Sequence, residues 1–177
     1  MAEKPTADLK TIIDALARQG QPPDSDALLL VGKSLAKLFG VDADEVAILN
    51  LDVKNKRLKF VIPEKLSAIG TIPLSSATAL AARTARERRP EVVNNFSSAR
   101  HATVFEGVPL GRDPSEMIQK IMSAPILDGT DVRGVVQISR KGRSTSDAGQ
   151  DFVQKDLHAL VQIAPTLEPL LKLCPTA

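Results

Sequence analysis

Residues 117–142, MIQKIMSAPILDGTDVRGVVQISRKG, contain two apolar runs separated by an Asp-Gly turn, and they decide the fold. Asp-Gly pairs are typical of tight turns between antiparallel strands, so the stretch predicts a hairpin with strands at Gln119–Leu127 and Val132–Arg140. Side chains alternate between the two faces of a strand, and in the second strand one set is apolar while the other is mixed. The apolar set is Val132, Gly134, Val136 and Ile138, and the mixed set is Arg133, Val135, Gln137 and Ser139.

We expect the apolar set to pack under helices and the mixed set to face a site. In that site Gln137 and Ser139 offer hydrogen bonds; the alternative is that they satisfy the backbone of a loop.

The chain around this hairpin is predicted to fold as an α+β domain with a central antiparallel sheet. Periodicity and capping residues predict helices at Thr6–Gln19, Ser25–Phe39, Ser75–Arg89 and from Gln150 onward, and strands at Glu45–Asp52 and Arg57–Pro63. Pro165 and Pro169 are expected to kink or break the last helix. We expect a single domain over residues 23–173, a helix and linker with a role in dimerisation over 1–22, and a tail over 174–177.

The composition excludes several classes of function. The net charge is only +2, and the chain has no Trp, no Tyr and five Phe, which argues against nucleic-acid binding and against a large planar cofactor. The single cysteine, Cys174, can form neither an intramolecular disulfide nor a cysteine-based metal site, and it favours a reducing compartment. With neither a signal core nor an apolar run of membrane-spanning length, we expect a cytoplasmic protein without membrane contact or cofactor.

Three stretches resemble the GAF domain family, in order and at matching spacing over residues 27–171. They are ALAARTARERRPEVVNN (79–95), IMSAPILDGTDVRGVVQISRKG (121–142) and DFVQKDLHALVQIA (151–164). The resemblance implies that the terminal helices cover one face of the sheet and often dimerise. It also implies that a short helix and a long loop enclose a ligand pocket on the other face.

Two known activities on that fold are poorly matched by these residues. Free methionine sulfoxide reductases of this family need redox cysteines in the pocket, whereas Cys174 lies in the tail. Cyclic-nucleotide-binding members carry an Asn-Lys-Phe segment followed by an acidic pair; Asn94, Asn95 and Phe96 match the first part, but no acidic pair follows. We therefore expect a protein that is not an enzyme, with cyclic-nucleotide binding as a weaker alternative.

The candidate ligand-binding residues are Asn95, Phe96, Arg100, Phe105, Met122, Gln137 and Ser139. An arginine matches carboxylate, phosphate or nitrate groups, so Arg100 is a candidate anion contact; the alternative is a surface arginine. Met122 offers an adaptable wall, or else belongs to the core. The resulting hypothesis is a sensing module that binds a small ligand, anions included, and passes the signal through a homodimer of terminal helices or a signalling partner. The second hypothesis is an interaction module with a vestigial pocket.

Overall fold

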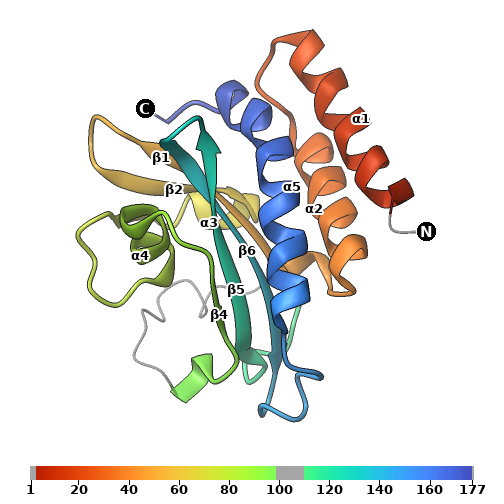
Figure 1. The fold of residues 1–177 in the computed structure, drawn as a ribbon, viewed down its shortest axis with the longest axis vertical. Helices are drawn as coiled ribbons and strands as arrows, with labels where there is room; N and C mark the ends of the chain where they lie inside the picture. The colour runs from red at the N-terminus through yellow and green to blue at the C-terminus, as the bar shows by residue number, and fades with distance from the viewer. Residues whose placement is uncertain (1–2, 99–109, 177) are drawn as a thin grey trace.

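A computed structural model describes residues 3–98 and 110–176 of the chain, with side chains described from residue 8 onward (Figure 1). In chain order the elements are α1 (Glu3–Gln19), α2 (Ser25–Phe39), a 3-10 turn (Ala43–Glu45), β1 (Val46–Asp52), β2 (Arg57–Ile62), α3 (Glu64–Ser67), β3 (Thr71–Pro73), α4 (Leu80–Glu87), β4 (Glu91–Val93), a second 3-10 turn (Phe96–Ser98), β5 (Met117–Asp128), β6 (Asp131–Gly142) and α5 (Gln154–Leu173).

The six strands form one antiparallel sheet in the order β3-β2-β1-β6-β5-β4, which confirms the predicted fold class. Both strands of the β5–β6 hairpin are interior strands of the sheet, because β1 pairs with the other edge of β6 and β4 with the other edge of β5. In the β1–β6 pairing, Ala47 lies opposite Gln137. Ala47 and Gln137, which are 90 residues apart in the sequence, therefore project from the same face of the sheet.

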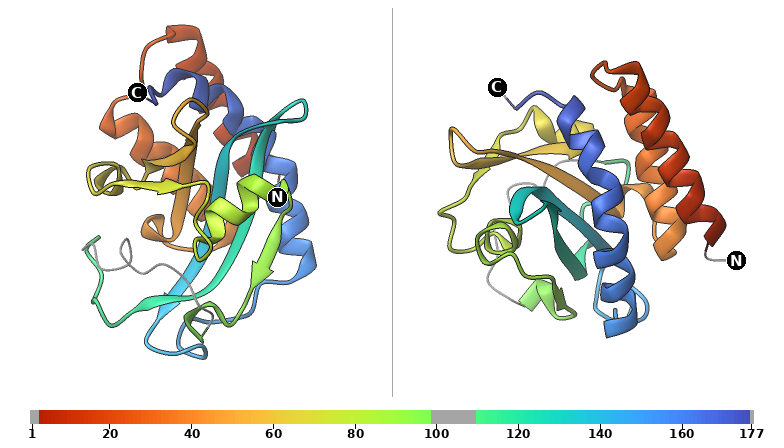
Figure 2. Two further views of the ribbon diagram at one scale, coloured as in Figure 1. Left: turned by 90° about the vertical axis from the view of Figure 1, so that its left-hand side faces the viewer. Right: turned by 45° about the horizontal axis from the view of Figure 1, so that its top comes forward.

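Helices α1, α2 and α5 lie together on one side of the sheet, and α4 lies on the other (Figures 1 and 2). The larger core cluster lies between these three helices and the sheet, and includes Val136 and Ile138 of β6 as expected. The apolar side of α1 packs into this cluster, where Leu9 and Ile13 are buried. These two α1 side chains are therefore not available for contacts between protomers.

A second core cluster fills the side of α4, and Val132 belongs to it rather than to the helix side, contrary to the prediction. The reason is a bulge: Ile126 pairs with Gly134 and Leu127 with Val132, so Arg133 has no opposite residue. An extra residue in one strand reverses the alternation beyond it. Val132 and Val135 consequently share a face although they are three residues apart.

Helix α5 continues through Pro165 and Pro169 as one α-helix, so of the predicted kink or break the break does not occur. Its buried side contains five leucines, an isoleucine and an alanine, whose packing against the sheet and α1 holds the segment helical. Asn50 of β1 stabilises the C-terminal end of α5, since its Nδ2 donates to the carbonyl oxygens of Leu171 (3.2 Å) and Cys174 (3.0 Å). Neither α5 nor any other helix in the described part is both long and apolar enough to span a membrane.

Candidate functional site

A cavity of about 110 Å³ lies between the sheet and the short elements on the α4 side. Its walls are mostly apolar. The sheet contributes Ala47, Phe60, Ile118, Ile121, Gln137 and Ser139; α3, β3 and α4 contribute Leu66, Ile72, Leu80 and Ala81. Asp44, Glu45, Leu110 and Lys141 lie in its wall as well.

The polar residues in the sheet wall come from β6. Gln137 and Ser139 are two residues apart and therefore project from the same face. Ser139 is buried and its Oγ donates to the carbonyl oxygen of Glu45 (3.3 Å), while Gln137 Nε2 donates to Ser123 Oγ (3.1 Å). The same face of β6 thus provides polar groups and, at Val135, an apolar contact.

The amino end of α4 forms part of the opposite wall. This helix begins at Leu80, later than the predicted Ser75: residues 75–79 pass through the end of a turn and a bend, in which the Ala79 N–H donates to Ser76 Oγ (3.1 Å). Leu80 and Ala81 line the cavity with the first turn of the helix. First-turn N–H groups have no intrahelical acceptor and carry a partial positive charge, which favours an electronegative group nearby.

The carboxylates near the cavity are paired within the protein. Glu45 accepts from the backbone N–H groups of Asp42 (2.8 Å) and Lys141 (2.6 Å), and Lys141 Nζ donates to the carbonyl oxygen of Asp44 (3.0 Å). Asp42, Asp44 and Glu45 lie close enough together to suit a metal ion. The guanidinium of Arg112 engages this group, 2.6 Å from Asp42 and 2.8 Å from Asp44, and supplies the positive charge there.

Arg112 ties the segment before β5 to the 3-10 turn before β1. Besides Asp42 and Asp44 it contacts Glu116 (3.0 Å), and it lies two residues after the cavity-lining Leu110. Burial on its own would raise the pKa of Asp44, but the hydrogen bond from Arg112 and the charges of Lys141 and Arg112 outweigh it, so the pKa lies below its usual 3.8.

Replacing Arg112 by Gln should lower the free energy of unfolding at neutral pH by about 1–3 kcal/mol, because partly buried carboxylates lose a charged hydrogen-bond donor. The matched control is Arg143→Gln: Arg143 pairs with Asp113 on an exposed site, 66% accessible, so its replacement should destabilise the protein much less than that of Arg112. Urea unfolding of both variants measures the difference.

The difference in the free energy of unfolding between wild type and Arg112→Gln should become smaller as the pH falls. Asp44 has a lowered pKa in the folded protein, so its contribution is present above 3.8 and disappears as the pH falls below that value. A difference between wild type and Arg112→Gln that stays constant from pH 7 to pH 2 would contradict this assignment.

Of the candidate residues predicted from the sequence, the structure brings Gln137 and Ser139 together at the cavity. Met122 does not line it. Ile121 occupies the cavity face of β5, so Met122 points to the other face, where it is fully buried in the larger core cluster. Its alternative assignment to the core is the correct one.

The Asn-Asn-Phe segment lies outside the cavity wall. Phe96 is buried behind Leu80 and Ile121, and Asn95 is exposed. Asn94 has a structural role, since it donates to the carbonyl oxygen of Phe152 and accepts from its N–H, both at 2.9 Å. Arg100 and Phe105 lie outside the described residues, and their roles stay predictions.

The apolar walls formed by Phe60, Leu66 and Ile72 were not anticipated. Phe60 and Leu66 could be recognised as apolar residues of a strand and a short helix. However, only the pairing of β2 with β1, and of β1 with β6, places Phe60 on the same face as Gln137.

No family model matches the chain, and no curated protein matches it. Solved structures do. The GAF domain of a phosphoenolpyruvate-protein phosphotransferase from Acinetobacter is 17% identical, with a TM-score of 0.64 over 94% of this chain and 92% of that one. Free methionine-R-sulfoxide reductase from Neisseria meningitidis, in complex with its substrate, is 15% identical with a TM-score of 0.64, over 98% and 89%. The nlh2 GAF domain of A. aeolicus in an inactive state is 16% identical with a TM-score of 0.55, over 98% and 99%.

These similarities confirm the predicted fold: the chain has the fold of a GAF domain. The fold is shared by regulatory domains and by an enzyme, the reductase.

Proposed function

We propose that this domain is a non-catalytic sensor that binds a small molecule in the cavity between β6 and the amino end of α4. The observation that carries the proposal is a mostly apolar cavity whose wall includes the polar side chains of Gln137 and Ser139 and, from α4, the first-turn residues Leu80 and Ala81. Ligand sites are typically apolar pockets with a few placed polar groups. The amino end of α4 favours a ligand with an electronegative group, including a small anion.

The size of the cavity limits the ligand. A cavity of roughly 150 Å³ accommodates benzene, and this one measures about 110 Å³. The ligand therefore has a handful of non-hydrogen atoms. A cyclic nucleotide would require the walls to move apart, which argues against that alternative.

The position of the cysteine supports a non-catalytic role. Reduction of a sulfoxide needs a reactive thiol beside the substrate, but Cys174 caps α5 and is not among the cavity-lining residues. Its Sγ donates to the carbonyl oxygen of Leu170, and burial raises the pKa of the thiol to about 11. A thiol with that pKa is almost entirely protonated at neutral pH. A single, half-buried free thiol also suits a cytoplasmic location, which we retain as part of the proposal.

A thermal-shift panel of small anions and small neutral molecules tests the binding proposal. A true ligand at about 100 times its dissociation constant should stabilise the fold by roughly 2.7 kcal/mol. Gln137→Leu should reduce this stabilisation, whereas Gln162→Leu, the same change on an exposed turn of α5, should leave it intact. Equal responses in the two variants would contradict the proposed site.

We further propose that the signal leaves through a homodimer formed by the outer face of α2. Asp26, Leu29, Leu30 and Lys33 are exposed and lie on one stripe of this helix. Two antiparallel copies of the stripe are complementary: Asp26 meets Lys33 of the second copy, and Leu29 meets Leu30. Leu29 and Leu30 are 50% and 49% exposed, more than core leucines of α2 such as Leu35, so a partner would bury apolar surface. A ligand would act by favouring one arrangement of the dimer over another.

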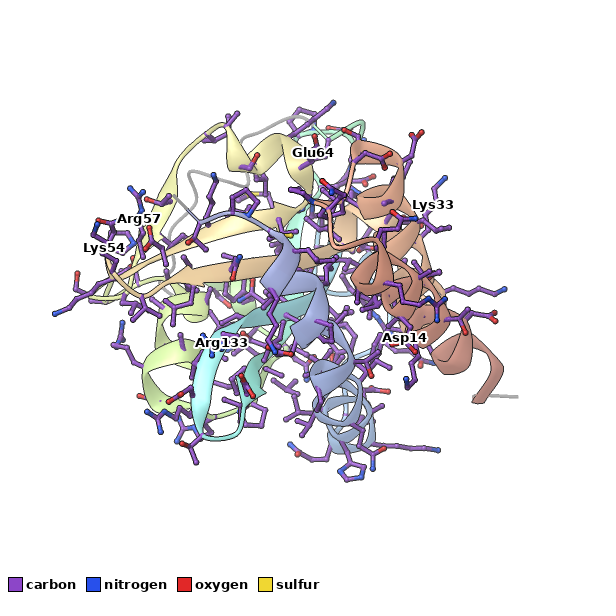
Figure 3. All side chains as sticks on the ribbon, turned by 90° about the horizontal axis from the view of Figure 1, so that it is seen from above. Asp14, Lys33, Lys54, Arg57, Glu64 and Arg133 are labelled. Atoms are coloured by element: carbon purple, nitrogen blue, oxygen red, sulfur yellow. The ribbon has the colours of Figure 1, made fainter. Side chains whose placement is uncertain are left out.

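Charge reversal tests the dimer. Asp26→Lys or Lys33→Asp alone should weaken association by placing like charges opposite each other, and the double variant should restore it. Lys54→Asp is the control, because Lys54 lies on the opposite side of the molecule from Lys33 (Figure 3). Sedimentation equilibrium over a range of concentrations gives the dissociation constants. If the wild type is monomeric throughout, or the double variant behaves like the single ones, this interface is wrong; if the interface forms but no ligand binds, the interaction module is the better description.

A further inference from the structure

We propose that Gln137 selects ligands that carry an N–H or O–H donor, and that Ser123 and Thr84 are the positioning residues that impose this selection. The inference rests on the proposed binding function of the cavity and specifies the chemistry of its ligand. It is carried by a directional chain of hydrogen bonds that begins in the cavity wall and ends inside α4.

The chain of hydrogen bonds runs from β6 across β5 to α4. Gln137 Nε2 lies 3.1 Å from Ser123 Oγ, Ser123 Oγ lies 2.7 Å from Thr84 Oγ1, and Thr84 Oγ1 lies 2.9 Å from the carbonyl oxygen of Leu80. Ser123 is fully buried and Thr84 is 2% exposed, so water does not compete for these groups. The strand register supports the geometry, since Ser123 and Gln137 are paired across β5 and β6.

The number of hydroxyl protons determines which group donates and which accepts in each of these hydrogen bonds. A carbonyl oxygen only accepts, so the single hydroxyl proton of Thr84 is donated to Leu80. Ser123 must then donate its own proton to Thr84, which leaves Ser123 Oγ as the acceptor for Gln137. The donating atom of Gln137 is therefore its amide nitrogen.

The opposite orientation of the amide is less favourable. If Gln137 turned its oxygen toward Ser123, Ser123 would have to donate to it and Thr84 would have to donate to Ser123. The buried oxygens of Thr84 and Leu80 would then face each other at 2.9 Å without a proton between them. The chain loses one hydrogen bond in that arrangement, so the first orientation is preferred.

The fixed orientation leaves Gln137 Oε1 as the acceptor for the ligand. It has no hydrogen-bond partner among the described residues, and Gln137 lines the cavity. Ser139 adds to the same polarity, because its proton is donated to Glu45 and its lone pairs remain. Gln137 Oε1 and the lone pairs of Ser139 thus accept hydrogen bonds in the β6 wall, and the donor that remains on Gln137 is its second Nε2 proton. A ligand with a hydroxyl or amino group is favoured there, and one with a carbonyl in the same place meets lone-pair repulsion.

Two isosteric pairs of probes test the selection: lactate against pyruvate, and 2-propanol against acetone. In each pair the first molecule offers an O–H where the second offers a carbonyl. NMR titrations of the wild type should give affinities about tenfold higher for lactate and 2-propanol than for pyruvate and acetone, whose acceptors cannot pair with the amide oxygen of the half-buried Gln137.

Ser123→Ala and Thr84→Val should bring the ratio of affinities close to one, because the amide of Gln137 is then free to turn. Thr84→Val conserves the shape of the side chain and serves if Ser123→Ala fails to fold. Ser97→Ala is the matched control: it removes a serine that is also hydrogen-bonded to a glutamine amide, that of Gln119 at 2.6 Å, outside the cavity, and it should leave the ratio unchanged. The Nε2 proton signals of Gln137 give a readout without ligand, since one proton should be protected from exchange in the wild type and exposed in Ser123→Ala.

The outcomes separate the two proposals. Equal affinities within each pair, a preference for the carbonyl compounds, or a ratio that survives both Ser123→Ala and Thr84→Val would overturn the selection by Gln137 while leaving the binding function in place. If none of the four probes binds even at high concentration, the proposed function fails, and the selection fails with it.

Discussion

Gly134→Ala should be strongly destabilising, with a loss of about 3 kcal/mol in the free energy of unfolding. A methyl group at this position would lie 2.1 Å from the backbone oxygen of Leu49 and 2.7 Å from a side-chain carbon of Leu171. The leucine side chain of α5 could turn away, but the backbone oxygen belongs to β1, which is paired with β6. The β1–β6 pairing would have to shift. We expect the melting temperature to fall by roughly 6–12 °C for a chain of this length.

Gly32→Ala is the matched control, and its expected sign is opposite. Gly32 is buried in the interior of α2, where a methyl group would meet only a side-chain carbon of Ile62 at 3.5 Å, an ordinary contact. Alanine is favoured over glycine inside a helix by roughly 0.5–1 kcal/mol, so this variant should be slightly more stable than the wild type. If Gly134→Ala were as stable as Gly32→Ala, the close approach of β1 and α5 to β6 would be wrong.

The fold was predictable from the sequence because its signals are local. The Asp-Gly turn and the period-two alternation of β6 are readable from neighbouring residues, and they located the central hairpin and the two polar residues of the cavity wall. The bulge at Arg133 was not readable, because it depends on which residues of β5 and β6 pair. The face of Met122 in the β5–β6 hairpin was missed because both faces of β5 are apolar and alternation alone could not assign them.

The cavity itself could be predicted only in part. Its polar residues follow from one strand, but its apolar walls come from β1, β2, α3, β3 and α4, which are brought together by strand pairing. The hydrogen-bond chain from Gln137 through Ser123 to Thr84 joins residues of β6, β5 and α4. Contacts between elements so distant in sequence leave no periodic signal, and a single sequence contains no other record of them.

The predicted break at Pro165 failed for an energetic reason, and the same reason leads to a second large effect. A proline inside a helix removes one hydrogen bond and costs about 3 kcal/mol relative to alanine. Helix α5 is continuous despite two such residues, so packing of its buried side must offset both costs. Replacing Pro165 and Pro169 by Ala together should release much of this cost, because the carbonyls of Val161 and Pro165 regain intrahelical donors.

The gain is smaller than the sum of the two costs, since alanine also leaves the unfolded chain more flexible, by about 0.4–1 kcal/mol at each site. We expect the double variant to be more stable than the wild type by about 4–5 kcal/mol, and each single variant by roughly half of that. Pro175→Ala is the control: Pro175 lies beyond the end of α5, so its replacement should bring no gain. Urea unfolding of the wild type, the two single variants, the double variant and Pro175→Ala measures these differences. A double variant no more stable than Pro175→Ala would mean that the two prolines do not destabilise the folded helix. The packing of α5 against the sheet and α1 would then have no such cost to offset.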